Sequence, residues 1–204
     1  MPPIVDQPEA YFKQFIRHDD PLLHALEAEA QAEKIPIIGP VVGELLFVLA
    51  RALRARSILE LGTAAGYSAI YLARACALNA GLLTTLELDP NLAARARQNL
   101  QRAGLAPHAT VVCGDALDQL RRMEGPFDLV FMDIEKADYA RALPDCQRLL
   151  RPGGLLVADN VAFPDADPFN RAIFSDSGWR PVSLLAFLPG HSPEHDGLCL
   201  ALRC

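Results

Sequence analysis

From residue 57 onward, short apolar segments alternate with amphipathic segments, and this alternation constrains the fold more than any other feature. The apolar segments are SILEL, GLLTTLEL, ATVVC, FDLVFM and GGLLVA, and each is followed by a predicted helix, the last one near residues 167–176. Strands that are apolar almost throughout indicate a mostly parallel sheet with helices on both faces. The closing segments PVSLLAFLP and DGLCLALRC are joined by a short loop, so they must pair antiparallel. The sequence therefore predicts a doubly wound α/β fold that ends in an antiparallel hairpin, with right-handed crossovers.

The first 55 residues have a different pattern. Residues 7–33 are rich in Ala, Leu and Glu, and residues 39–55 carry apolar side chains at helical spacing, so both segments are predicted helices. The segment KIPIIGP between them contains two prolines and a glycine, which is typical of a loop. We expect a single domain over residues 1–204, with N-terminal helices in 1–55 and an α/β core in 56–204.

Composition excludes several classes of protein. The chain has 204 residues, a net charge of −6 and no basic run, which argues against non-specific binding to nucleic acid. No apolar run approaches the roughly 18–20 residues that a membrane-spanning helix needs. Five scattered cysteines form no CxxC pair and favour free thiols in a reducing compartment. These features predict a cytoplasmic protein.

The first predicted strand ends in the glycine turn ELGTAAGYS, residues 60–68. Gly62 and Gly66 permit the tight turn that opens the next helix. A dinucleotide-binding fingerprint would have a glycine where Ala64 stands, and that methyl group disfavours a pyrophosphate. Glu60 is also a poor partner for phosphate, and its carboxylate suits a cationic ligand instead.

The next two predicted strands also end in acidic residues. Glu87 follows the second strand and can accept hydrogen bonds from both hydroxyls of a ribose. Asp115 follows the third strand and could accept from an adenine amino group. Either acid alone could simply cap a helix. Together with the glycine turn they outline a pocket for an adenosine that bears a positive group, a description that S-adenosylmethionine fits.

A second cluster of polar side chains follows the fourth and fifth predicted strands. Asp133 comes after FDLVFM, and Asp159 and Asn160 come after GGLLVA. If these strands are neighbours, their tips lie about 5 Å apart. An all-oxygen set of two aspartates and an asparagine suits a hard cation, Mg²⁺ first, with Mn²⁺ or Ca²⁺ also compatible. The alternative for Asp159 and Asn160 is helix capping.

Lys136 lies three residues after Asp133. A divalent cation nearby would disfavour its protonated form, so Lys136 could act as a general base towards a hydroxyl held on the cation. In the alternative interpretation it is a surface lysine that pairs with Glu135 or Asp138.

At this point the sequence resembles the cation-dependent O-methyltransferases of the caffeoyl-CoA and catechol type. The resemblance rests on four motifs in order, ILELGTAAGYS, TLELDP, FDLVFMDIEKADY and LLRPGGLLVADNV, and it extends from IPIIGPVVGELL to HDGLCLALRC. It implies the Rossmann-like, seven-stranded sheet of class I methyltransferases, use of S-adenosylmethionine and a divalent cation, and a homodimer whose N-terminal helices form interface and lid.

The resemblance also implies roles for individual residues. Glu60, Gly62 and Ser68 would hold the methionine part of the cofactor, Glu87 its ribose, and Asp115 and Ala116 its adenine, with Ile38 and Asp133 also bordering the cofactor. It implies Asp133, Asp159 and Asn160 as metal ligands, and Lys136 as the catalytic base beside Asp133.

The chain departs from the family pattern in two places. The segment after Val161 is short, without the insertion that shapes the acceptor pocket in many members. No residue of SLLAFLPGHSPEHDG matches the glutamate that grips the second hydroxyl in the catechol enzyme, and Glu194 is a poor candidate. We expect His191 and His195 in this loop to be exposed to solvent.

The leading hypothesis is thus methyl transfer to a phenolic or catechol-type hydroxyl of a small molecule. A hydroxylated uridine in transfer RNA is an alternative acceptor, although the acidic composition argues against it. A nicotinamide-dependent oxidoreductase is an alternative of another class, which Ala64 and the lack of a second domain disfavour. The last alternative is a binding protein without catalysis, and the retained metal trio disfavours it.

Overall fold

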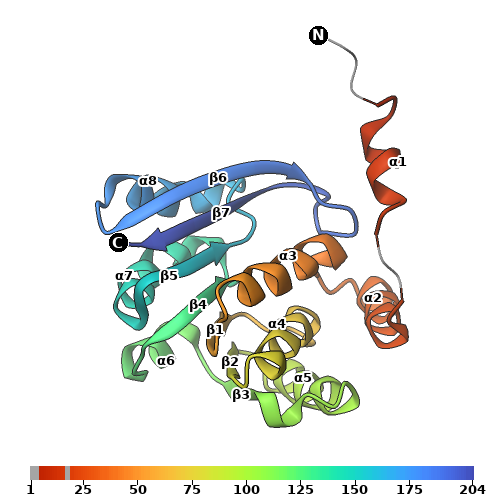
Figure 1. Cartoon of the computed structure of the whole chain (residues 1–204), viewed down its shortest axis with the longest axis horizontal. Coiled ribbons are helices and arrows are strands. Elements are labelled where there is room, and N and C mark those ends of the chain that lie inside the picture. The colour runs from red at the N-terminus through yellow and green to blue at the C-terminus, as the bar shows by residue number, and fades with distance from the viewer. Residues whose placement is uncertain (1–4, 17–18) are drawn as a thin grey trace.

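The computed structural model describes residues 5–16 and 19–204 (Figure 1). Its strands are β1 Ser57–Leu61, β2 Leu82–Glu87, β3 Ala109–Cys113, β4 Phe127–Met132, β5 Leu150–Ala158, β6 Trp179–Phe187 and β7 His195–Arg203. Its helices are α1 Pro8–Lys13, α2 Pro21–Glu33, α3 Gly39–Ala52, α4 Tyr67–Leu78, α5 Pro90–Arg102, α6 Ala116–Arg122, α7 Tyr139–Leu149 and α8 Asp167–Ser175. Short 3₁₀ helices cover Ala106–His108, Lys136–Asp138 and Pro164–Ala166.

The strands form one seven-stranded sheet in the order β3-β2-β1-β4-β5-β7-β6. Strands β1 to β5 pair in parallel, and β7 pairs antiparallel with both β5 and β6. The predicted doubly wound sheet and its terminal antiparallel hairpin are therefore confirmed. The order reverses between β1 and β4, and ligands bind sheets of this kind at the carboxyl ends of the strands beside such a reversal.

Side chains of the central strands alternate between two hydrophobic clusters, one on each face of the sheet. Along β4, Leu129 and Phe131 join a cluster with α3, α4 and α5, whereas Val130 and Met132 join a cluster with α6, α7 and α8. Figure 1 shows these two groups of helices on either side of the sheet. Both faces are thus buried, which explains why the strand sequences are apolar without interruption.

The prediction of one helix over residues 7–33 is wrong, because the structure has two helices there. Asp20 caps α2, its carboxylate accepting hydrogen bonds from the backbone N–H groups of Leu22 and Leu23. Pro21 occupies the first helical position, where its missing N–H costs nothing. A residue before proline also disfavours helical geometry, so the chain cannot run on as one helix. Residues 17 and 18 of the predicted helix lie outside the described residues.

The predicted helix over 39–55 is present as α3, and the predicted helix near 167–176 as α8. Ion pairs bind α2 to the α/β core. Arg74 of α4 pairs with Asp20, and Arg95 of α5 pairs with Glu29 and Glu33. In the part of the chain that the structure describes, no helix is long and apolar enough to cross a bilayer.

Gly62 brings the tip of β1 into contact with the tip of β4. Its φ is +88°, in the left-handed region, and a Cβ atom on it would lie 2.0 Å from the carbonyl oxygen of Asp133. A side chain is therefore excluded both by backbone geometry and by the neighbouring strand. This glycine sets how closely the first turn approaches Asp133.

We predict that Gly62→Ala is strongly destabilising. Gly104 provides a matched control, because its φ is +70° and a Cβ there would meet no described atom within 4 Å. Gly104→Ala should reduce the free energy of unfolding by about 1 kcal/mol, the cost of the left-handed backbone alone. Gly62→Ala should cost at least about 2 kcal/mol more, because the clash adds to that strain. Urea unfolding measures both; equal losses would contradict the close approach.

Candidate active site

Glu60 is a fully buried carboxyl group at the carboxyl end of β1. Its Oε2 accepts a hydrogen bond from the hydroxyl of Thr85 on β2, while its Oε1 has no well-aligned partner among the described residues. Burial raises the pKa of Glu60 to about 7, helped by the nearby charges of Asp133 and Glu87 and opposed by the hydroxyls of Ser68 and Thr85. A buried carboxyl oxygen without a partner fits a site for a cationic group.

Glu87 lies at the end of β2, as predicted, and it also supports the glycine turn. Its Oε2 accepts hydrogen bonds from the backbone N–H groups of Thr63, at 3.2 Å, and Ala64, at 2.7 Å. Its Oε1 accepts from the N–H of Asp89 at 2.9 Å. Ala64 has a left-handed φ of +45°, which turns its N–H towards this carboxylate. Each carboxylate oxygen can accept more than one hydrogen bond, so Glu87 can still bind a ligand.

Two adjoining cavities, of about 120 and 610 Å³, surround these acids. Gly62, Glu87 and Asp133 line both of them. Ile38 and Ser68 line the smaller cavity, while Asp115 and Ala116 line the larger one. Asp115 also caps α6 by accepting from the N–H of Asp118 at 2.9 Å, so the capping role holds as well. The residues predicted to bind the cofactor therefore line these two cavities, except Glu60, which is fully buried and lines neither.

Asp133 and Lys136 form an ion pair at the tip of β4. Lys136 Nζ lies 2.9 Å from Asp133 Oδ1 and 5.7 Å from the centre of the Tyr139 ring. Burial raises the pKa of Asp133, the charge of Lys136 lowers it, and the charge of Asp159 raises it again, with a net increase. The charge of Asp159 thus acts on Asp133 from the neighbouring strand.

Tyr139 fixes the tips of β4 and β5 relative to each other. Its buried hydroxyl contacts the carbonyl oxygens of Met132 at 3.1 Å and Asp159 at 3.0 Å. The backbone N–H of Asp159 donates to Met132 as well. Tyr139 lies in the motif FMDIEKADY, but nothing in a single sequence distinguishes this buried tyrosine from other tyrosines on helix faces.

His191 is buried, so the prediction that it is exposed is wrong. The β6–β7 loop folds back onto the start of α3, where a Cβ on Gly39 would lie 2.4 Å from the backbone of Gly190. This packing places His191 Nε2 2.8 Å from Asp159 Oδ2. Burial lowers the pKa of His191, but its hydrogen bond to Asp159 and the charge of Asp159 raise it more. His195 is exposed, as predicted, and contacts Glu9.

Asp196 is a second residue that sequence reasoning missed. It is almost fully buried and accepts a hydrogen bond from Asn160 Nδ2 at 2.6 Å. This bond uses the amide nitrogen of Asn160 and leaves its Oδ1 as the end that can face a cation. Asn160 itself has a left-handed φ of +52°, which asparagine tolerates better than most residues. The charged residue at the start of the largely apolar strand β7 was the available signal.

The donor set of the predicted metal trio fits a hard cation in chemical type. Asp133 and Asp159 offer carboxylate oxygens, and Asn160 offers the amide oxygen that Asp196 orients. Within residues 5–16 and 19–204, no three or more His, Cys, Asp or Glu side chains are grouped so as to hold a metal ion. A cation here would need the Asn160 amide as well as the two carboxylates.

We predict that affinity for S-adenosylmethionine rises with pH as Glu60 ionises. The pKa of Glu60 lies above its usual value, so below about pH 7 the carboxyl is neutral and a cationic ligand must displace its proton. The dissociation constant should therefore fall roughly tenfold between pH 6 and pH 7.5 and then level off. Glu60→Gln should bind more weakly and without this dependence. Titration calorimetry measures both, and a parallel pH profile in the two proteins would contradict the role of Glu60.

The chain matches the model of the family described as O-methyltransferase over residues 17–166. It is 45% identical to a catechol O-methyltransferase of Niastella koreensis over 70% of this chain and 66% of that protein. It is 43% identical to a catechol O-methyltransferase of Mycobacterium tuberculosis over 78% of this chain and 72% of that protein. The first of these matches thus spans just under two thirds of that relative.

Solved structures resemble the chain over nearly its whole length. The O-methyltransferase TomG from Streptomyces achromogenes, in complex with SAM, has a TM-score of 0.86 at 30% identity and covers 97% of this chain and 96% of its own. An O-methyltransferase from Bacillus cereus, in complex with SAH, has a TM-score of 0.86 at 28% identity, with 97% of each chain covered. With the buried acids and the glycine turn at the strand tips, these matches show that the chain belongs to the S-adenosylmethionine-dependent O-methyltransferases.

Proposed function

We propose that this O-methyltransferase uses a divalent cation to methylate a phenolic or catechol-type hydroxyl of a small molecule. The observation that carries the proposal is the position of Asp133, Asp159 and Asn160 at the tips of β4 and β5. We call these three residues the oxygen-bearing corner. Asp133 of this corner lines the same cavities as Gly62 and Glu87, and its charge acts on Glu60. The two catechol O-methyltransferases among the relatives support the acceptor class.

The proposed cofactor contacts follow the order of the strands. Glu60 and Ser68 hold the amino-acid end, where the unpartnered Glu60 oxygen meets a cationic group. Glu87 binds the ribose hydroxyls, and Asp115 and Ala116 border the adenine. The carbonyl end of β4 beside Gly62 and the buried Ile38 complete the cavity.

Asp133, Asp159 and Asn160 are the proposed ligands of the cation, Mg²⁺ first and Mn²⁺ or Ca²⁺ as alternatives. When bound, the cation would act as a Lewis acid that makes an acceptor hydroxyl more acidic. Asp196 holds the Asn160 amide in the orientation that this role needs, and Tyr139 fixes the two strand tips. The protein thereby orients the acceptor oxygen for in-line attack on the methyl group.

Lys136 is the proposed general base. Its Nζ takes the proton of the acceptor hydroxyl, and the oxygen attacks the methyl carbon. The bond between that carbon and sulfur breaks, and the sulfonium leaves as a neutral thioether. Lys136 can serve only in its neutral form, and Asp133, which pairs with it, would also be a ligand of the proposed cation. Asp133 therefore positions Lys136 next to the oxygen that loses its proton.

The proposed acceptor cavity has a volume of about 680 Å³ and lies between the N-terminal helices and the β6–β7 loop. Pro36 and Ile37 line this cavity and also the smaller cofactor cavity, so the two spaces adjoin. His191 also lines this cavity and contacts Asp159. Two lysines, Lys13 and Lys34, and two glutamates, Glu27 and Glu194, lie around it, a balance that favours a neutral acceptor.

A hydroxylated uridine in transfer RNA remains the second candidate acceptor. The net charge of −6 and the balanced charges around the cavity disfavour a polyanionic partner. Membership of the O-methyltransferase family removes the nicotinamide-dependent alternative.

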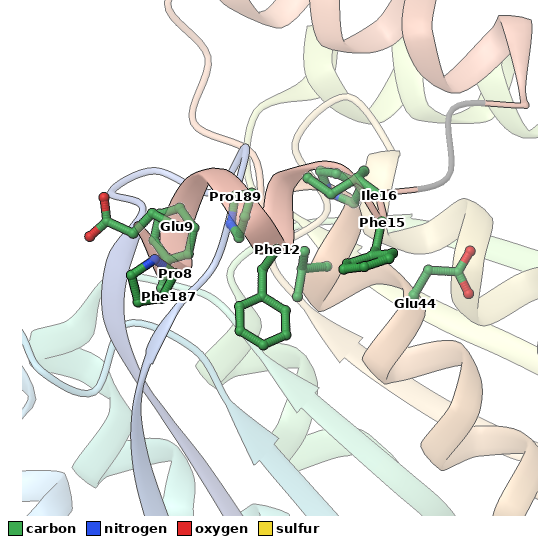
Figure 2. Close-up of a pocket in the computed structure, with 10 residues that line it drawn as sticks. Pro8, Glu9, Phe12, Phe15, Ile16, Glu44, Phe187 and Pro189 are labelled. Atoms are coloured by element: carbon green, nitrogen blue, oxygen red, sulfur yellow. The ribbon is translucent and has the colours of Figure 1, made fainter. Parts of the chain in front are cut away.

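We also propose that the chain forms a homodimer through its N-terminal region. Figure 2 shows Phe12 and Phe15 directed into a largely apolar cavity of about 650 Å³ between α1, α3 and the end of β6. These side chains are 55% and 60% exposed in one chain, and clusters of exposed aromatic residues commonly mark interfaces. A second copy would cover them. Light scattering that gives the mass of a single chain at micromolar concentration would contradict the dimer.

We predict that Lys136→Met lowers kcat by about 10² to 10⁴, the usual contribution of a general base, with little change in KM. Lys136→Arg is the matched control, since arginine keeps the positive charge and can pair with Asp133 but cannot accept a proton at neutral pH. Both variants should lose activity. An active Lys136→Arg would show that the positive charge matters and that Lys136 is not the base.

The proposed function is tested by a methyl-transfer screen over catechols, caffeoyl esters and hydroxylated nucleosides, with and without a chelator. We expect transfer to a catechol or a caffeoyl ester that stops on chelation and recovers when Mg²⁺ is added. Transfer that is indifferent to chelation would refute the role of the cation. Transfer confined to nucleosides, together with a missing methyl group in RNA from cells without the protein, would favour the second candidate.

A further inference from the structure

We call the cavity of about 650 Å³ between α1, α3 and the end of β6 the apolar cavity (Figure 2). Three aromatic rings line it: Phe12 of α1, Phe15 just after this helix, and Phe187 at the end of β6. Among the described residues that line it, the charged ones are Glu9 and Glu44, and both are exposed. The charge of this cavity is therefore confined to two exposed carboxylates.

The apolar cavity adjoins the proposed acceptor cavity. Ile16, Pro40 and Pro189 line both of them. The two prolines are buried and come from segments in close contact, since a Cβ on Gly190 would lie 2.8 Å from Cδ of Pro40. One elongated ligand that passes these prolines would occupy both cavities.

The two cavities differ in the chemistry of their walls. The acceptor cavity carries groups that bear charge or form hydrogen bonds, among them Glu27, Lys34 and His191. The apolar cavity instead offers aromatic rings, which stabilise an alkyl chain or a second ring by burying its apolar surface. Cavities of about 300–1,000 Å³ hold drug-sized ligands, so a bare catechol would leave most of the acceptor cavity, of about 680 Å³, unfilled. A ligand with a polar head and an apolar extension matches both walls.

We infer that the apolar cavity is a subsite for an uncharged, apolar extension of the acceptor, such as an alkyl chain or a second aromatic ring. The inference rests on the proposed function, because the hydroxyl of the same acceptor must reach the oxygen-bearing corner. Glu9 and Glu44 repel an anionic extension, so a coenzyme A thioester, with its phosphates, is a poor acceptor. The substrate class thereby narrows to catechols that carry an uncharged apolar substituent.

A second copy of the chain is the competing occupant. The proposed homodimer would cover Phe12 and Phe15 and so close the apolar cavity from solvent. If a segment of the second copy filled the cavity instead, no acceptor could enter it. The test therefore uses Val41 and Phe187, which line the apolar cavity from α3 and β6 and do not line the acceptor cavity. Light scattering measures the mass of each variant.

The test is methyl transfer to catechols that carry straight alkyl chains from methyl to hexyl, compared with bare catechol and caffeoyl coenzyme A. In the wild type, KM should fall by up to about fourfold for each methylene that becomes buried in the apolar cavity. The value of kcat should change little, because the chain binds equally in the ground state and the transition state. A KM that does not depend on chain length overturns the inference.

Val41→Phe fills part of the apolar cavity. It should raise KM for hexylcatechol by about tenfold, the cost of forcing extra volume into a packed space, and leave bare catechol unchanged. Val48→Phe is the matched control, because it makes the same change on the same helix at a position that is 56% exposed and lines neither cavity. This control should behave like the wild type with every acceptor.

Glu44→Lys tests the charge of the extension, and its exposed position makes a folding defect easy to avoid. The change replaces a repelling carboxylate with an attracting ammonium group. KM for caffeoyl coenzyme A should therefore fall by about threefold at low salt and by less at high salt, while KM for hexylcatechol stays the same. An unchanged KM for caffeoyl coenzyme A, or a wild type that prefers it to hexylcatechol, overturns the inference.

Thermal unfolding checks that the variants fold. If Val41→Phe does not fold, Phe187→Ala decides, because it removes one aromatic wall and should raise KM for hexylcatechol alone. An equal loss with all acceptors that accompanies a change in mass would assign the apolar cavity to the second copy and overturn the inference.

Calorimetry of the alkylcatechols with the protein saturated with S-adenosylhomocysteine and Mg²⁺ separates the two possible failures. Methylation of bare catechol without any effect of chain length leaves the proposed function standing and removes the subsite. Binding that strengthens with chain length and weakens in Val41→Phe, without methyl transfer, supports the subsite and refutes the proposed function. An absence of binding by any alkylcatechol overturns the inference.

Discussion

The parallel register across β1, β4 and β5 is the constraint on which the rest of the site depends. Leu61, Met132 and Ala158 are aligned, and the residue after each strand donates its N–H across to the neighbour: Asp133 to Leu61 at 2.8 Å and Asp159 to Met132 at 3.0 Å. A slip of one residue in either pair would turn one aspartate to the opposite face of the sheet. Two buried hydrophobic faces resist such a slip, so the apolar core fixes where the carboxylates meet.

Concentrating acids at the strand tips has an electrostatic cost, which the structure offsets by specific partners. Glu60 carries a pKa near 7, and burial raises the pKa of Asp133 even with Lys136 beside it. Buried charges are stable only when they are paired and hydrogen-bonded. Thr85 on the neighbouring strand is a partner of Glu60, and Lys136, three residues further along the chain, is the partner of Asp133. A carboxyl group whose pKa lies near 7, such as Glu60, ionises readily when a cationic ligand binds.

The sheet and most of the site could be predicted from the sequence because both follow from short-range patterns. Continuous apolar runs located β1 to β5, and the polar residue after each run located Glu87, Asp115, Asp133 and Asp159. The break between α1 and α2 was missed although Asp20 and Pro21 carry the signal, because the surrounding Ala- and Glu-rich composition suggested one helix. His191 was misplaced for another reason: its burial depends on the contact of its loop with Gly39, some 150 residues away in the sequence, which no local pattern encodes.

The attachment of α1 has a consequence for how substrates reach the interior. This helix, all of whose residues are described, has none buried, and its contacts to the hairpin are the Lys13–Glu194 and Glu9–His195 pairs with Lys13 above the ring of Phe187. Exposed ion pairs contribute little free energy and are weakened by dissolved salt. The outer wall of the acceptor cavity is thus held by weak contacts. We expect α1 to move away from the hairpin at physiological ionic strength while the sheet stays intact. Amide hydrogen exchange in α1 that is as slow as in the central strands would exclude this movement.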